Sequence, residues 1–270
     1  MVSVRVPSLF LAAALWGSPL PAQAVEIVPG SRPAVAATES SNKPAAMLPS
    51  QPAPNLSPER RGDIYMARKM YREAVEMYQQ APQDSAVIWN KIGIAYHQML
   101  KLDVARKHYE KAIKLNPNYS EAINNLGTVY YAKKSYRRAT NYYKKALRLA
   151  PKSASIYSNL GTAYFARKKY KEAFEAYQMA LSLDPEVFEH RSTYGVMLQE
   201  RTVEERAKFH YYLARTYAKA GDFEHALIYM RKALEEGFKE KQKFLEAPEF
   251  EKMRETAEFQ ALIKLEPKVL

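Results

Sequence analysis

The sequence predicts an all-α fold, a solenoid of stacked helix-turn-helix units, from two observations. The first is a 34-residue period, in which glycines recur at Gly93, Gly127, Gly161 and Gly195. Five further columns keep the same step and begin at Tyr96, Ala105, Tyr109, Ala112 and Pro117. The second is apolar spacing of three and four residues within each period, which is typical of one helix face. Because one such unit cannot bury its apolar face alone, neighbouring units must stack.

The first 24 residues have the pattern of a secretory signal peptide. Arg5 is the only charge before Glu26, residues 9–16 are apolar, and Ala22 and Ala24 place small residues at a cleavage site. A membrane anchor is the weaker alternative, because spanning a bilayer takes about 20 apolar residues. We therefore expect an exported protein, periplasmic or secreted, that is cleaved near Ala24 and has no transmembrane span in its mature chain.

Residues 25–57 are predicted to form a disordered tether. Ten of the 16 prolines fall within the first 58 residues, and residues 25–57 contain no Tyr or Phe. A stretch of this composition buries too little apolar surface to offset the entropy lost on ordering. An irregular but ordered cap on the fold is the alternative.

Each period of the remaining chain predicts two helices that approach closely. A small residue lies in each helix, as Gly93 and Ala105 show, and large Tyr rings fill the space beside them. A proline ends the second helix, because the residue before Pro is pushed out of the α region. Ser135 and Asp222 are placed to cap the helices that follow them.

These columns resemble the tetratricopeptide repeat family, whose 34-residue pattern is Trp, Leu-Gly, Tyr, Ala, Phe/Tyr, Ala and Pro. Residues 86–119 carry it as Trp89, Ile92, Gly93, Tyr96, Ala105, Tyr109, Ala112 and Pro117. Residues 120–153 and 154–187 repeat it, and residues 55–85 keep a version three residues shorter. The resemblance covers residues 58–236, and it implies a right-handed superhelical solenoid of five to six units with a concave groove.

The register of the last units is ambiguous. Residues 188–221 fit the pattern, but so do the overlapping residues 207–236. Both versions share a helix over about residues 203–219, opened by a capping box of Thr202 and Glu205 and expected to be buried on two sides. Residues 237–270 are predicted to form C-terminal capping helices.

No motif for catalysis, a metal or a cofactor occurs in the sequence. There is no Cys, no His pair spaced for metal ligation, no G-x-S-x-G motif and no phosphate-binding glycine loop. His108 lies among Lys and Glu residues and is predicted to be solvated. We therefore expect a non-catalytic protein, and an enzyme is the alternative that lacks a supporting motif.

The family resemblance implies that exposed positions of the first helices line the groove and bind an extended peptide or a partner helix. These positions are rich in amides and hydroxyls, which suit a peptide backbone. They are Asn90, Lys91, His97, Asn124, Asn125, Thr128, Tyr131, Ser158, Asn159, Thr162 and Phe165. Asparagines that only bridge neighbouring repeats are an equally open alternative. The carboxylate clamp known in the family is incomplete, so a chaperone-tail adaptor is not expected.

The net charge of +12 is concentrated in residues 59–187, and residues 120–153 alone hold eight basic groups against Glu121. Most of the basic groups fall in a second helix or the turn before it. They form a predicted basic ridge: Lys133, Lys134, Arg137, Arg138, Lys144, Lys145 and Arg148. An ordinary solvated surface is one alternative, and nucleic acid is disfavoured because no recognition motif accompanies the charge.

The sequence thus predicts a non-catalytic, exported scaffold that needs no cofactor. It would hold a partner protein in the groove while the ridge meets an anionic surface or an acidic protein. The second hypothesis is an accessory factor of a cell-envelope assembly or polysaccharide system, which binds an anionic glycan or lipid surface.

Overall fold

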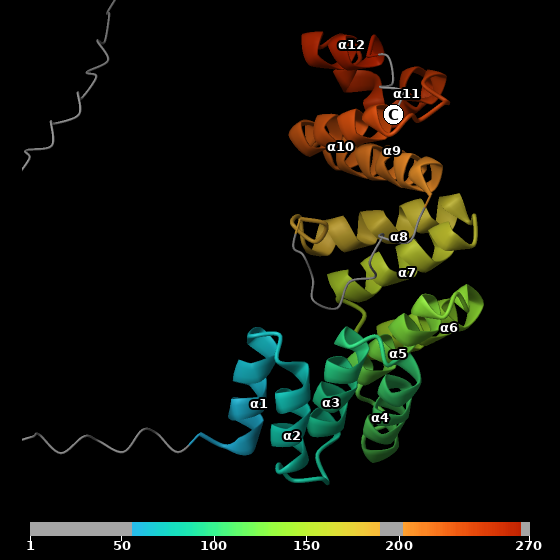
Figure 1. Ribbon diagram of the computed structural model, residues 1–270. Coiled ribbons are helices and arrows are strands. Elements are labelled where there is room, and N and C mark those ends of the chain that lie inside the picture. Colours follow the sequence, from blue (N-terminus) through green and yellow to red (C-terminus); the bar gives the residue numbers. More distant parts are fainter. Residues whose placement is uncertain (1–55, 190–201, 266–270) are drawn as a thin grey trace, which may run out of the picture. The chain divides into compact units, whose positions relative to one another are not determined.

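The computed structural model describes residues 56–189 and 202–265, and every secondary-structure element in these ranges is a helix (Figure 1). The elements are α1 (Pro58–Ala67), α2 (Tyr71–Gln79), α3 (Ala86–Gln98), α4 (Leu102–Leu115), α5 (Ser120–Ala132), α6 (Tyr136–Leu149), α7 (Ala154–Ala166), α8 (Tyr170–Leu183), α9 (Val203–Ala220), α10 (Phe223–Glu235), α11 (Gln242–Glu246), the 3-10 helix η2 (Pro248–Met253) and α12 (Ala257–Ile263). The predicted signal peptide, nearly all of the predicted tether and the column member Gly195 lie outside the described residues.

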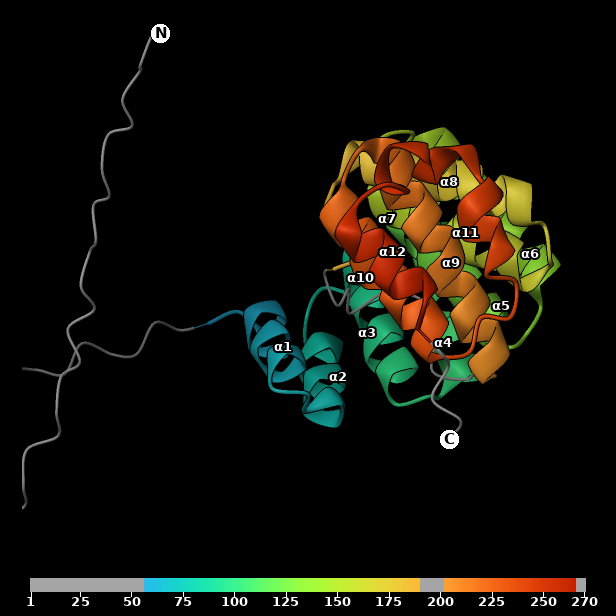
Figure 2. The same cartoon turned by 90° about the horizontal axis from the view of Figure 1, so that it is seen from above.

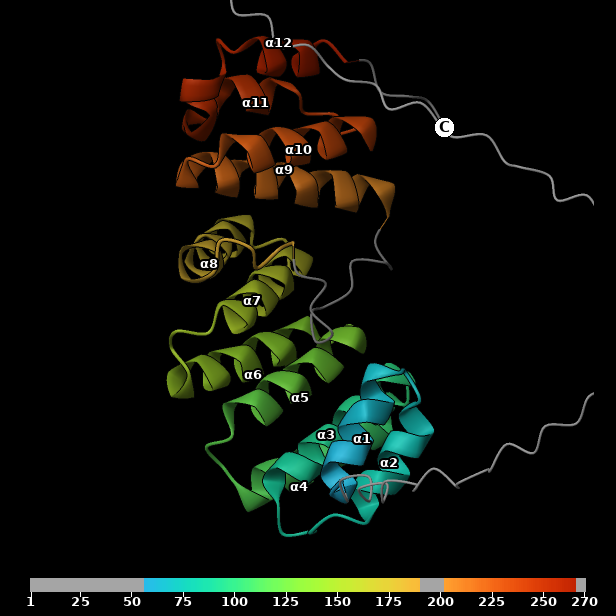
Figure 3. The same ribbon diagram turned by 90° about the vertical axis from the view of Figure 1, so that its left-hand side faces the viewer.

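The helices pack as consecutive pairs, and this confirms the predicted all-α solenoid. Within the described ranges α1 packs on α2, α3 on α4, α5 on α6, α7 on α8 and α9 on α10. Each pair then packs on the next, and the first helices α3, α5 and α7 also touch in sequence. Figures 1 and 3 show the pairs following one another in chain order. Figure 2, seen from above, shows α12 lying over α10 at the C-terminal end.

The glycine column exists because a tyrosine of the second helix occupies the space of a Cβ atom. A Cβ added to Gly127 would lie 2.7 Å from Cε1 of Tyr143, well inside van der Waals contact. The same clash recurs for Gly62 with Tyr78, Gly93 with Tyr109 and Gly161 with Tyr177. The four tyrosines are almost completely buried. The close approach of the two helices that the sequence predicts is therefore confirmed.

The turn between the two helices of a unit uses a left-handed backbone conformation at a residue that is not glycine. Lys69, Leu100 and Lys168 have φ of 59°, and Lys134 has φ of 57°. This region crowds Cβ against the following carbonyl oxygen, so residues other than Gly enter it at a cost. Four turns of the described chain carry this local strain.

The predicted helix caps have different outcomes. Asp222 accepts a hydrogen bond from the His225 backbone N–H, which confirms it as the cap of α10. Ser135 occupies the corresponding position of α6, but its side chain makes no capping bond, so that prediction is wrong. The sequence shows which residue precedes a helix but not its rotamer. The Thr202–Glu205 capping box is confirmed, and α9 begins directly after Thr202.

The helix α9 is covered on two sides, as the sequence predicts. It packs on α8 and on α10, and its Tyr211, Tyr212, Leu213 and Tyr217 are buried. The short helices after Gly237 supply Phe244, Phe250 and Phe259, which are fully buried. The ring of Tyr211 meets the ring of Phe244 edge-on at 5.0 Å between centroids. These aromatic side chains bury the last apolar surface of the α9–α10 pair.

Candidate functional site

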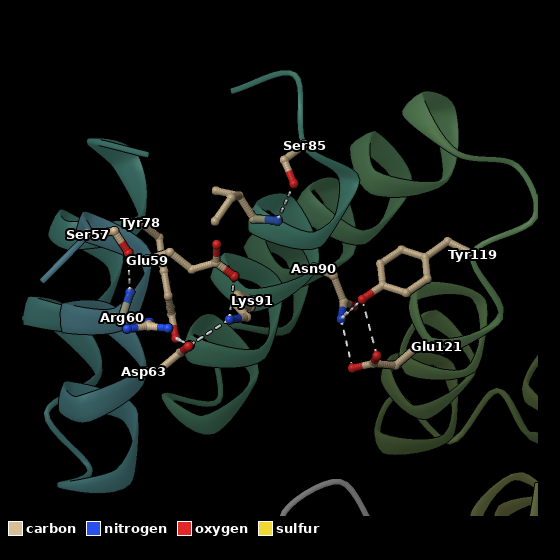
Figure 4. Close-up of polar contacts among 11 residues, drawn as sticks. Ser57, Glu59, Arg60, Asp63, Tyr78, Ser85, Asn90, Lys91, Tyr119 and Glu121 are labelled. Carbon is tan, nitrogen blue, oxygen red and sulfur yellow. Dashed lines mark hydrogen bonds and ion pairs between the residues drawn. The ribbon is translucent and has the colours of Figure 1, made fainter. Parts of the chain in front are cut away.

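Polar side chains link the first helices α1, α3, α5 and α7 in sequence, and an ion pair forms the first of these links (Figure 4). Lys91 Nζ on α3 lies 2.7 Å from Glu59 Oε1 and 2.8 Å from Asp63 Oδ1, both on α1. The Tyr78 hydroxyl of α2 donates to the same Asp63 oxygen at 2.8 Å. Burial alone would lower the pKa of Lys91, but the bonds and charges of Asp63 and Glu59 outweigh it and raise that pKa.

Amides make the next two links. Asn125 Nδ2 on α5 donates to Asn90 Oδ1 on α3 at 3.0 Å. Asn159 Nδ2 on α7 donates to Asn124 Oδ1 on α5 at 3.1 Å. Within α5, Asn124 Nδ2 donates to Asn125 Oδ1 at 3.3 Å. These four asparagines form an amide relay across three units, in which each side chain donates to the next in the order Asn159, Asn124, Asn125 and Asn90.

The relay ends on a carboxylate. Asn90 Nδ2 donates to Glu121 Oε1 at 3.0 Å and to the Tyr119 hydroxyl oxygen at 3.3 Å (Figure 4). The Tyr119 hydroxyl in turn donates to Glu121 Oε2 at 3.1 Å. Glu121, the single acidic residue of residues 120–153, is therefore engaged on the first-helix side of the stack and not beside the basic ridge.

The relay asparagines are buried, with exposed fractions of 1–6%. Their contacts are those of the bridging alternative that the sequence leaves open, since buried amides need hydrogen-bond partners. The Thr128 and Thr162 hydroxyls donate to the backbone oxygens of Asn124 and Ser158 at 3.2 and 2.9 Å. Binding of a partner by these residues stays a prediction.

Four of the eleven predicted groove residues are half-buried and remain partly at the surface. They are Lys91, His97, Tyr131 and Ser158. Phe165 is buried instead, and its ring meets the ring of Phe209 edge-on at 5.6 Å. Lys91 is already neutralised by two carboxylates, so it is not free to hold the carboxylate of a partner.

The basic ridge lies on α6 and on the turn before it. Lys133 pairs with Asp103 of the preceding unit at 2.7 Å, and this bond holds the pKa of Asp103 below its usual value. Arg138 lies over the Tyr130 ring at 5.6 Å, and Lys144 lies over the Tyr164 ring at the same distance. Within the two described ranges, no carboxylate pairs with the six ridge cations other than Lys133.

The prediction that His108 is solvated is wrong. Its ring is half-buried and stacks on Trp89 and Tyr96, with centroids 5.4 and 5.1 Å apart. Burial, and then the charge of Lys111, lowers the pKa of His108. The 34-residue period could have predicted this stacking. Tyr142 and Tyr130 lie one period after His108 and Tyr96, and their rings stack in the same way.

No group of three or more His, Asp or Glu side chains within the described ranges is placed to hold a metal ion. Of the helices that the structure describes, none combines the length and apolar character needed to cross a membrane.

Comparison with known proteins identifies the repeats. Family models described as "Tetratricopeptide repeat" or "TPR repeat" match residues 59–118, 108–140, 127–166, 154–187 and 207–236. The chain is a tetratricopeptide repeat (TPR) protein. Members of this class are protein–protein interaction scaffolds, and this chain is one. The last matched unit, residues 207–236, joins α9 to α10.

Individual relatives of this TPR protein match over part of its length or with modest similarity. The Arabidopsis thaliana protein "Tetratricopeptide repeat domain-containing protein PYG7, chloroplastic" is 37% identical over 71 residues, which is 24% of each chain. A MamA crystal structure has a TM-score of 0.45 at 21% identity and covers 65% of this chain and 93% of its own. MamA from Desulfovibrio magneticus RS-1 has a TM-score of 0.46 at 23% identity and covers 66% and 92%.

Proposed function

We propose that this TPR scaffold is exported, holds an extended peptide or helix of a partner protein along its first helices, and presents its basic ridge to an anionic partner. The observation that carries the proposal is the set of links between first helices. Lys91 and the amide relay fix α1, α3, α5 and α7 relative to one another. A surface that is already ordered loses less entropy when it binds a ligand.

Ser158 offers a clean test of the groove. Its side chain on α7 is half-buried, and its hydroxyl makes no hydrogen bond with the described residues. We expect Ser158→Arg to block first-helix binding without breaking a side-chain contact. Peptides selected from a random display library on the wild-type protein should bind the variant at least tenfold more weakly.

The matched control is Ser182→Arg, the same change on the exposed surface of the second helix α8. It should leave peptide affinity within twofold of wild type. Equal binding by the wild type and both variants would contradict a first-helix groove.

Export has its own test. We expect residues 1–30 to carry a fused alkaline phosphatase, which is active only outside the cytoplasm, across the inner membrane of a bacterial host. The mass of the mature chain should then correspond to a start at Val25. A reporter that remains inactive would contradict export.

The unpaired ridge cations favour a second candidate, an accessory factor of a cell-envelope assembly or polysaccharide system that binds an anionic glycan or lipid surface directly. Binding through the ridge should weaken steeply as ionic strength rises. Binding in the groove should change little over the same titration, so salt dependence separates the two surfaces.

A further inference from the structure

An open depression of about 770 Å³ lies where the α5–α6 turn meets the end of α7. Its lining is Lys134, Ser135, Tyr136, Arg137, Arg138, Asn141 and Arg167. Four of these seven residues are cations and none is acidic. Arg167 follows α7 and belongs to the next repeat, so the depression extends beyond the ridge that the sequence predicts.

Two cations beside the depression are neutralised, whereas the cations in its wall are not paired with a carboxylate of the described residues. Lys133 pairs with Asp103, and Lys169 pairs with Glu172, each at 2.7 Å. Among the described residues, no carboxylate pairs with the four lining cations. The Ser135 hydroxyl makes no capping bond, and the Asn141 amide has no hydrogen-bond partner in the described part of the chain. The wall therefore presents several unused donors together with uncompensated positive charge.

The positive surface continues along α6 from this depression. Arg137, Asn141, Lys144 and Arg148 are spaced by three or four residues, which places them on one helix face. They are exposed, and the eleven residue steps from Arg137 to Arg148 correspond to about 17 Å of helix. An elongated anion with repeated charges matches such a strip better than a single small ion does.

We propose that the depression and the α6 strip bind an acidic segment of a partner polypeptide, with Asp or Glu carboxylates held by Arg137 and Arg167. Guanidinium groups recognise carboxylates through paired, charge-assisted hydrogen bonds. This inference rests on the proposed scaffold function and assigns the chemistry of the partner at the ridge.

Two other anionic partners fit the surface less well. A membrane surface engages exposed apolar side chains as well as charge, and the exposed large apolar residue of α6, Leu149, lies at the end of that helix away from the depression. Single-stranded nucleic acid needs aromatic rings on which bases stack. The nearby Tyr136 packs against Tyr131 at 5.1 Å, and Tyr142 stacks on Tyr130 at 5.1 Å, so each of these rings already has an aromatic partner within the protein.

The test is fluorescence anisotropy with a labelled peptide of ten glutamates. We expect it to bind wild-type protein and to bind Arg137→Glu/Arg167→Glu at least tenfold more weakly. A control pair, Arg72→Glu/Arg231→Glu, changes the net charge equally at exposed sites on α2 and α10 and should stay within twofold of wild type. If the reversed pair fails to fold by circular dichroism, Arg137→Gln/Arg167→Gln tests the same contacts more mildly.

Equal weakening by the site pair and the control pair would overturn the proposal, because net charge alone would then explain binding. Tighter binding of vesicles with 30% phosphatidylserine, or of a 20-nucleotide oligo(dT), would also overturn it in favour of those classes. Ser158→Arg should leave glutamate-peptide binding unchanged, so a failure of the groove proposal is distinguishable from a failure of this one.

Discussion

Position 127 requires glycine because a tyrosine ring occupies the space of a side chain, and not because of an unusual backbone conformation. Gly127 lies inside α5 with Cε1 of Tyr143 where a Cβ would be. Gly127→Ala should destabilise the fold by about 1–3 kcal/mol through overpacking. The higher helix propensity of Ala should offset up to about 1 kcal/mol of this loss. Urea unfolding at equilibrium measures the change.

A double-mutant cycle with Tyr143→Leu provides the control, because removing the ring removes the clash. Gly127→Ala should then be neutral or stabilising in the Tyr143→Leu background. A full destabilisation in that background would contradict the role assigned to the ring.

Leu100 illustrates the opposite case, in which the backbone and not the side chain is constrained. Its φ is 59° and its side chain is 78% exposed, so little packing is lost when it is replaced. Leu100→Gly should stabilise the protein by up to about 1 kcal/mol by relieving the left-handed conformation. Thermal unfolding of the variant checks this. Lys101→Gly, at the next residue with φ of −83°, should destabilise instead.

At the level of elements, the relay couples units that the period only places side by side. Asn125→Ala would leave Asn90 Oδ1 and Asn124 Nδ2 without these partners inside the stack. We expect a loss of about 1–3 kcal/mol, the usual cost of an unsatisfied buried polar group. Chemical denaturation followed by circular dichroism measures it.

Asn141→Ala is the matched control, because this asparagine is exposed on α6 and has no hydrogen-bond partner among the described residues. It should change the free energy of unfolding by less than about 0.5 kcal/mol. Similar losses in both variants would show that the relay contributes nothing specific.

The helix pairs were predictable from the sequence because their packing depends on residue size, which the 34-residue columns display directly. The relay was not predictable, because its two asparagine–asparagine bonds between units join residues 35 apart in the chain and the choice of partner depends on rotamers. The same amide pattern fits both a groove lining and a bridge. Ser135 precedes α6 as predicted but does not cap it, because capping also depends on the side-chain rotamer. The depression could not be predicted, because one of its lining residues, Arg167, comes from the next unit.

At the level of the whole molecule, three half-buried histidines predict how stability responds to pH. Burial lowers the pKa of His97, of His108 and of His210, although Glu236 partly opposes the shift at His210. Below the usual value near 6.5 the unfolded chain therefore binds protons that the folded chain does not. Stability should fall as the pH drops from 7.5 to 5, by at most about 1.4 kcal/mol per pH unit for each such group.

His108→Phe keeps a ring between Trp89 and Tyr96 but removes one titrating group. The slope of unfolding free energy against pH should become shallower below pH 6.5. Denaturant titrations at several pH values compare the two proteins, and identical slopes would contradict the assignment of His108.

The amide relay also determines which repeat can be duplicated. Of the linked first helices, α5 alone carries asparagine at both linking positions, so a second copy of residues 120–153 inserted beside the first would find an amide on either side. In a second copy of residues 154–187, the residue equivalent to Asn159 would face Ser158 in place of an amide. In a second copy of residues 86–119, the residue equivalent to Lys91 would face the Asn90 amide in place of two carboxylates. These three repeats share one period, yet among them only the middle one can be duplicated with every asparagine link preserved.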